Sequence, residues 1–181
     1  NVRANDLFHR CGTASLTSRG MYIYLSPNTT ITNSEILNNV NYEVSTAAYI
    51  VGLYIQESNY ATISNSKITD NHLTSTSLSA GDANGIYVDR SNFTTIENTN
   101  VSGTKSSSTT TDNIFFNIGL DRSHNATIRN VTASDNSGGS ATNTFSGASA
   151  GIYLLNSQNA TITNVTANNN QFNGVYIEST S

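Results

Sequence analysis

The sequence predicts an all-β fold: a right-handed single-stranded parallel β-helix of about five to six coils, with three short strands in each coil. Two observations carry this prediction. The pattern Thr-Ile-x-Asn occurs five times, and its Ile residues lie 32 to 34 residues apart. A short apolar strand opened by Gly precedes most copies. One such unit is too small to bury its own apolar face, so successive units must stack to close a core.

The composition supports this fold and excludes several others. The 181 residues include 27 Asn, 25 Ser and 25 Thr, whereas charged residues are only 11 % and the net charge is -4. Asn, Ser and Thr favour caps and turns over helix interiors, and 9 Tyr and 6 Phe argue against a disordered chain. The sequence has no basic patch of the kind that predicts nucleic-acid binding. It also has no run of 18 apolar residues, which a membrane-spanning helix needs.

The Gly-led strand places a tyrosine on one face and two apolar residues on the other, because side chains alternate along a strand. Copies such as Gly52-Leu-Tyr-Ile and Gly85-Ile-Tyr-Val show the pattern, and the fourth copy departs from it as Asn117-Ile-Gly-Leu. Stacked rings stabilise a sheet by cross-strand contact, and exposed rings also suit glycan binding. The predicted exposed column is Tyr22, Tyr54, Tyr87, Tyr153 and Tyr176.

Asparagine recurs at two corners of the coil. Asn tolerates left-handed backbone in turns, and stacked copies form amide ladders between strands. We expect the first of these corners to form an inner ladder, in which the sequon residues Asn130 and Asn164 stay unmodified. The second corner holds Asn39, Asn71, Asn136 and Asn170, with Thr104 as the exception. The predicted structural ladder at the first corner is Asn33, Asn65, Asn98, Asn130 and Asn164.

Four copies contain added residues, whereas the last spans only 23 residues from Gly151 to Gly174. We expect a single β-helix domain over 1–181, with the added segments at one corner forming a side wall. Long inserts on one edge of a solenoid often mark its interaction face. The predicted inserts are 40–51, 72–84, 105–116 and 137–150.

Several Asn residues lie in the pattern Asn-x-Ser/Thr that accepts N-linked glycans on surface loops. Four of these sequons align, to within a residue, at the turn before the Thr-Ile strand. The predicted glycosylation sites are therefore Asn28, Asn92, Asn125 and Asn159.

A carboxylate pair is the candidate catalytic site. Asp89 and Asp121 stand two residues after the tyrosine position on neighbouring coils, and each precedes an Arg. Carboxylates about 5 Å apart suit a retaining glycosidase, and they also suit a hard cation such as Ca²⁺. A structural role is the third interpretation, because the Arg residues can balance the charge. Leu155 interrupts the same column.

No metal site and no cofactor are predicted. Cys11 stands alone, and His9, His72 and His124 are far apart in the repeat frame. This spacing does not resemble the clustered ligand sets of structural or catalytic metals.

The repeated pattern Gly-[Ile/Val]-Tyr-[Leu/Val/Ile]-x-x-Ser-x-Asn-Ala-Thr-Ile-x-Asn resembles right-handed parallel β-helix repeats of the pectin-lyase-like superfamily. It is most similar to NosD-type repeats of surface proteins. The resemblance implies the fold over nearly the whole chain and leaves activity open, because this fold supports many functions.

Two hypotheses about function follow. In the first, the chain is a structural extracellular or cell-surface protein, N-glycosylated, whose open coil edges at both ends stack head-to-tail on further copies into a filament, sheath or surface layer. In the second, it is a carbohydrate-active enzyme or glycan-binding module that uses the outward Tyr and Asp face. The sequence favours the structural protein over an enzyme, with itself and possibly glycans as partners.

Overall fold

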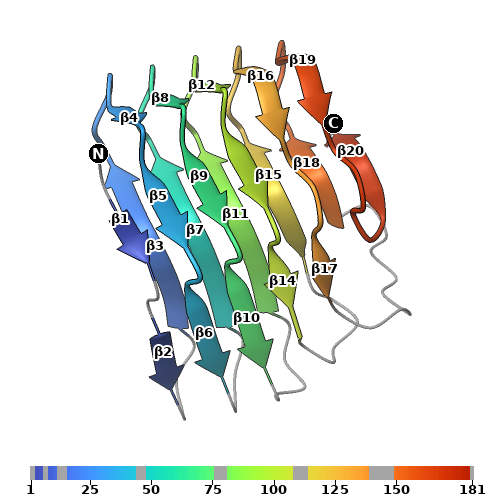
Figure 1. Ribbon diagram of the computed structural model, residues 1–181. Coiled ribbons are helices and arrows are strands. Elements are labelled where there is room, and N and C mark those ends of the chain that lie inside the picture. The colour runs from blue at the N-terminus through green and yellow to red at the C-terminus, as the bar shows by residue number, and fades with distance from the viewer. Residues whose placement is uncertain are drawn as a thin grey trace.

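The computed structural model describes residues 3–5, 8–11, 16–43, 48–75, 81–107, 114–138 and 149–179. It is a parallel β-solenoid, as predicted: strands from successive repeats lie side by side along one axis from the N-terminal to the C-terminal end (Figure 1). Every strand pair in the described residues is parallel.

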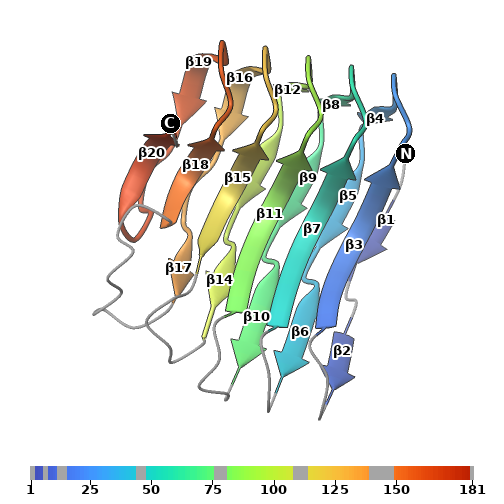
Figure 2. The same cartoon turned by 180° about the vertical axis from the view of Figure 1, so that it is seen from behind.

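The described strands form three sheets. The six-stranded Tyr sheet, in front in Figure 2, consists of β3 (Leu16–Tyr24), β7 (Ala48–Gln56), β11 (Gly81–Asp89), β15 (Phe115–Asp121), β18 (Ser149–Leu155) and β20 (Asn173–Glu178). The nine-stranded Ile sheet consists of β1 (Arg3–Asn5), β4 (Thr30–Thr32), β5 (Glu35–Leu37), β8 (Thr62–Ser64), β9 (Lys67–Thr69), β12 (Thr95–Glu97), β13 (Asn100–Ser102), β16 (Thr127–Thr132) and β19 (Thr161–Thr166). The five-stranded insert sheet consists of β2 (Phe8–Cys11), β6 (Val40–Glu43), β10 (His72–Ser75), β14 (Lys105–Ser106) and β17 (Ser137–Gly138).

The insert sheet shows what the added segments do. Their first residues form β6, β10, β14 and β17, and their last residues lengthen the strands of the Tyr sheet. A small core of Ile50, Leu73, Ala83 and Phe115, with Phe172 packed against it, lies between them. The insert therefore adds a fourth strand and a second hydrophobic compartment to the three predicted strands. The central parts of the predicted inserts, 44–47, 76–80, 108–113 and 139–148, lie outside the described residues, as do the ends 1–2 and 180–181 of the expected domain.

The main core consists of aliphatic columns that run along the solenoid axis. Ile31, Ile63 and Ile96 are paired in register across β4, β8 and β12. Leu53 and Ile86 face them from the Tyr sheet in the same buried cluster. Burying such a side chain stabilises the fold by about 1.5 to 3 kcal/mol, and the contacts along each column require a neighbouring coil.

The first Asn corner forms a ladder on the outside of the solenoid. All five predicted members have left-handed backbone, with φ between 48° and 52°. The amides of Asn130 and Asn164 donate to the preceding members of the ladder at 3.1 and 3.2 Å. The ladder prediction agrees with this geometry, whereas the expected inner position was wrong, because all five residues are exposed. The left-handed turn directs these side chains toward solvent.

The buried ladder lies at the second corner, and it explains the Gly that opens each tyrosine strand. Asn39 donates to Asn71 at 2.9 Å inside the solenoid. A Cβ added at Gly52 would lie 2.6 Å from Asn71 Nδ2, which is too close for any real side chain. The exceptional Asn117 occupies this glycine position in the fourth copy, where its amide donates to Ser134 O at 2.9 Å and to Asn170 Oδ1 at 3.3 Å.

Candidate functional site

The predicted tyrosine column lies on the outer face of the Tyr sheet, and register pairs Tyr22, Tyr54 and Tyr87 on successive coils. The ring centroids of these neighbours are 5.2 and 5.3 Å apart. The column is less exposed than predicted, because each ring packs against the next. Tyr22 is exposed at the N-terminal end of the column, but Tyr153 is only 8 % exposed.

Phe116 completes this column where the repeat lacks a tyrosine. Gly119 takes the tyrosine position on β15, and Phe116 occupies the space above it. The Phe116 ring centroid lies 5.8 Å from that of Tyr87 and 5.6 Å from that of Tyr153. Sequence reasoning noticed the missing Tyr and overlooked the replacement. The available signal was an aromatic residue shortly before the one copy without Tyr.

The hydroxyls of Tyr22, Tyr87 and Tyr153 donate hydrogen bonds to the neighbouring coil. Tyr22 donates to Gln56 Oε1 at 2.6 Å, and Tyr87 donates to Asp121 Oδ2 at 3.3 Å. Each acceptor stands two residues after the tyrosine position of the next coil. We call the set Gln56, Asp89, Asp121, Leu155 and Glu178 the acceptor column. Tyr153 continues the pattern by donating to Glu178 Oε2 at 2.7 Å.

Leu155 now has a physical explanation. Leu155 lies one coil after Gly119, and Gly119 has no hydroxyl to donate to it. An apolar residue therefore stands at the one place where the preceding coil offers no donor. A member of the acceptor column is polar where the preceding coil has a tyrosine, and it is apolar where the preceding coil has Gly119.

The candidate catalytic pair is held in ion pairs. Arg122 Nη2 lies 3.2 Å from Asp89 Oδ1 and 2.7 Å from Asp121 Oδ2, so one guanidinium bridges two coils. Arg90 Nη2 also lies 3.0 Å from Asp89 Oδ2, and both carboxylates are buried. Charge-assisted bonds of this kind are the stronger class of hydrogen bond. The structure brings the predicted pair together on adjacent coils, and its partners are those expected of the structural interpretation.

Burial moves the titration of Tyr54 and Tyr87 further above neutral pH. It raises the pKa of Tyr54 to about 12, and the nearby Asp89 carboxylate adds to the increase. Burial likewise raises the pKa of Tyr87, with a further contribution from Asp121. At neutral pH the Tyr87 hydroxyl is therefore a donor to Asp121.

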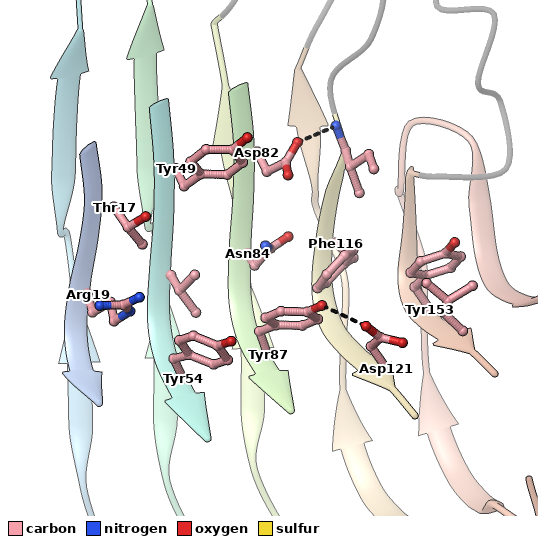
Figure 3. A pocket seen from close by; sticks show the side chains of 13 residues that line it. Thr17, Arg19, Tyr49, Tyr54, Asp82, Asn84, Tyr87, Phe116, Asp121 and Tyr153 are labelled. Carbon is pink, nitrogen blue, oxygen red and sulfur yellow. Dashed lines mark hydrogen bonds between the residues drawn. The ribbon is translucent and has the colours of Figure 1, made fainter. Parts of the chain in front are cut away.

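A pocket of about 380 Å³ opens beside the tyrosine column on the outer face of the Tyr sheet (Figure 3). Rings of Tyr54, Tyr87 and Phe116 line one part of it, and Tyr49 and Ile114 from the insert segments line another. Aromatic walls with a few polar groups are typical of small-molecule sites.

The polar groups of the pocket are Asp82, Asn84, Arg19 and Asp121, together with Thr17. Burial raises the pKa of Asp82 to about 6, although its Oδ1 accepts a hydrogen bond from the N–H of Ile114 at 3.2 Å. Asn84 is 6 % exposed, and its Oδ1 has no hydrogen-bond partner among the described residues. The Arg19 guanidinium lies 4.4 Å from the Tyr22 ring centroid.

The sequence did not predict this pocket because the side-chain alternation changes phase at Gly85. Asn84 and Tyr87 both line the pocket although they are three residues apart, whereas Ala83 packs into the small core. The ladder keeps the same register on both sides of Gly85, so the phase of the side chains changes without an inserted residue. A strict period of two assigns Asp82 and Asn84 to the wrong face.

Three of the four predicted sequon residues share one corner position, and Asn92 is offset from it by the one residue that the sequence indicated. Asn28, Asn125 and Asn159 are exposed and share left-handed φ values of 61°, 56° and 57°. Asn92 is offset by one residue and only half-exposed, and its Oδ1 accepts the N–H of His124 at 2.8 Å. The aligned position on its coil belongs to Phe93, with φ 58°.

No group of three His, Cys, Asp or Glu side chains in the described ranges is placed to hold a metal ion. No helix in this part of the chain is long and apolar enough to cross a membrane.

The fold and the stacked columns define a β-solenoid repeat protein. Residues 2–105, more than half of the chain, match the right handed beta helix region, so the chain belongs to that family. No curated protein matches the chain. Among solved structures, a trypsin-treated variant of QnrB1, a plasmid-mediated fluoroquinolone resistance protein, is 14 % identical, with 86 % of this chain and 91 % of that chain covered and a TM-score of 0.13. A second such variant is 11 % identical, with 82 % and 92 % covered and a TM-score of 0.11. At these scores the likeness carries no argument.

Proposed function

We propose that the protein is a structural extracellular or cell-surface β-helix whose outer carboxylates hold its coils together. The observation that carries this proposal is the match between the tyrosine and acceptor columns. Asp121 receives the Tyr87 hydroxyl and Arg122, and Leu155 replaces a polar acceptor where Gly119 removes the donor. Groups used in this way stabilise the stack and need no substrate.

The substitution of both carboxylates tests this proposal. In Asp89→Asn/Asp121→Asn, the loss of the Arg122 ion pairs lowers the melting temperature, and neither wild type nor variant cleaves a panel of polysaccharides. An enzyme gives the opposite pattern: the wild type cleaves one of them, and the double variant loses cleavage while its melting temperature is unchanged.

Self-assembly by head-to-tail stacking is part of the same proposal. Val175 and Ile177 on β20 are 43 % and 67 % exposed, although Ile152 and Leu154 in the same columns are buried. A further coil placed on β20 buries these side chains by the same register. We propose that a second copy supplies that coil in a filament, sheath or surface layer. Light scattering of wild type and Ile177→Lys tests this, because the charge removes a stacking contact and returns assemblies to monomers.

The location outside the cell rests on the sequons and on the resemblance to NosD-type surface-protein repeats. Exposed Asn28, Asn125 and Asn159 on one edge suit glycan attachment. Intact mass before and after enzymatic deglycosylation tests the modification.

A saccharide-binding role is the second candidate, and the pocket beside the tyrosine column supports it. Asp82 and Asn84 offer hydrogen bonds next to aromatic rings, and the Asn84 carboxamide oxygen has no partner in the described residues. Neutral sugars combine apolar faces with hydroxyl groups and fit this chemistry. Calorimetric titration with oligosaccharides tests it: Asn84→Ala loses binding, whereas Asn65→Ala on the exposed ladder retains it.

A further inference from the structure

Two aromatic rings at the sequon corner lie outside both hydrophobic compartments. Tyr60 is 54 % exposed and Phe93 is 46 % exposed. Their ring centroids are 4.9 Å apart and their planes differ by only 4°, so the two rings stack face to face in solvent. The inner faces of the rings contact each other, and the outer faces point along the solenoid axis in opposite directions.

Each outer face lies toward a coil that carries a sequon at the same corner position. The N–H of Asn28 bonds to Asn59 O at 2.9 Å, which places Asn28 one coil before Tyr60. The N–H of Phe93 bonds to His124 O at 2.9 Å, which places Asn125 one coil after Phe93. All four residues have left-handed φ between 56° and 61°, so their side chains leave the corner in the same way.

We propose that Asn28 and Asn125 carry N-linked glycans whose first saccharides lie on the outer faces of Tyr60 and Phe93. The order along the axis is then saccharide, Tyr60, Phe93, saccharide. Adjacent strands are about 4.8 Å apart, close to the 4.9 Å between the two rings. A sugar ring attached one coil away therefore continues the stack with its C–H face against the aromatic face. This inference rests on the glycosylation proposed above and adds its site selection and its physical role.

The other sequons at this edge lack such a surface. Asn159 has Asn125, not an aromatic residue, on the preceding coil, and its amide donates to Asn125 Oδ1 at 3.4 Å. Asn92 is half-exposed, and the hydroxyl of its sequon Thr94 is buried and donates to Ser91 O at 3.0 Å. Asn125 accepts the Asn159 amide through Oδ1, so this contact leaves its Nδ2 for glycan attachment.

The experiment uses the full chain secreted from a host that attaches N-linked glycans. Glycopeptide mass spectrometry measures occupancy at each Asn. Melting temperatures are then compared for wild type, Asn28→Gln, Tyr60→Ser and the double variant, with Asn125→Gln and Phe93→Ser as the second set. Asn159→Gln in wild type and in Phe93→Ser is the matched control.

We expect occupied Asn28 and Asn125, and a loss of about 2 °C for each Asn→Gln change that disappears when the paired ring is removed. Asn159→Gln gives the same small change in both backgrounds. Proton NMR provides a second readout, because ring currents shift the first saccharide's protons upfield in wild type and not in Tyr60→Ser.

Absence of glycan at Asn28 and Asn125 overturns the modification and the stacking together. Occupied sites with no upfield shift, and with equal losses in both backgrounds, overturn the stacking alone. Neither result affects the structural role proposed for Asp89 and Asp121, whose failure would appear as polysaccharide cleavage.

Discussion

Phe116 lies over Gly119 and replaces the tyrosine that this coil lacks. A Cβ on Gly119 would lie 2.0 Å from Phe116 Cε2, so the glycine is required by the ring above it. The two residues act as one unit that keeps the aromatic column continuous between Tyr87 and Tyr153.

Replacing either member of this unit destabilises the fold. Phe116→Ala removes a buried ring and costs about 3 kcal/mol of unfolding free energy. Gly119→Tyr alone clashes with Phe116 and costs about 2 kcal/mol. The double variant restores the regular repeat, so its loss is smaller than the sum of the two single losses. Urea denaturation measures all three, and strictly additive losses would contradict the unit.

Arg122 is expected to stabilise two buried carboxylates at once. Arg122→Ala leaves Asp89 and Asp121 facing each other on adjacent coils with Arg90 as the remaining bridge to Asp89. Because Arg122 is itself exposed, solvent screens part of this loss, and we expect about 1.5 kcal/mol. The matched control is Arg129→Ala, which removes a surface pair with Glu97 and costs less than about 1 kcal/mol. Equal losses of unfolding free energy in the two variants would show that the ion pairs of Arg122 stabilise the fold no more than an ordinary surface pair does.

Asp82 gives the pocket a pH dependence. Burial raises the pKa of Asp82 from its ordinary value of 3.8 to about 6, so the folded chain holds this proton more tightly than the unfolded chain. Its contribution to stability is complete below about pH 3.8 and is lost as pH rises through 6. Asp82→Asn removes this dependence and stabilises the fold by roughly 2 kcal/mol above pH 7. Urea midpoints measured between pH 4 and pH 8 check it.

The exposed Asp70→Asn serves as the control for that measurement, because Asp70 lies on a corner outside the pocket. Its slope of stability against pH is the reference for the buried site. A slope in Asp82→Asn equal to that of wild type would contradict the burial of the Asp82 carboxyl.

The glycines before the tyrosines differ in the space around them. A Cβ on Gly151 would lie 2.4 Å from Asn170 Nδ2 and 2.5 Å from Ala133 O, whereas a Cβ on Gly174 meets its nearest atom at 3.1 Å. Gly151→Ala should therefore cost about 2 kcal/mol, and Gly174→Ala less than about 1 kcal/mol. Thermal unfolding of the two variants compares them directly, and similar melting temperatures would contradict the close packing at Gly151.

Residues that repeat were predictable from the sequence, and residues that compensate for a broken repeat were not. The 32- to 34-residue spacing and the Tyr and Ile columns follow from period-two alternation and coil stacking. Phe116 was missed because its contact with the Gly119 position depends on the change of phase in the strand. Asp82 and Asn84 were missed for the same reason, since alternation through Gly85 directs them inward. The first Asn ladder was predicted on the inside of the solenoid. The sequence pattern fixes the spacing of these Asn residues, but it does not show that their left-handed turns direct the side chains outward.

The measurement that tests the central claim most directly is a double-mutant cycle on Tyr87 and Asp121. The cycle compares the unfolding free energies of wild type, Tyr87→Phe, Asp121→Leu and the double variant. If the hydroxyl and the carboxylate bind adjacent coils together, the two changes couple by about 1.5 kcal/mol. Tyr87→Phe combined with Glu97→Leu, on a different sheet, couples by about zero. A coupling near zero between Tyr87 and Asp121 would contradict the role of the outer carboxylates as acceptors that hold the coils.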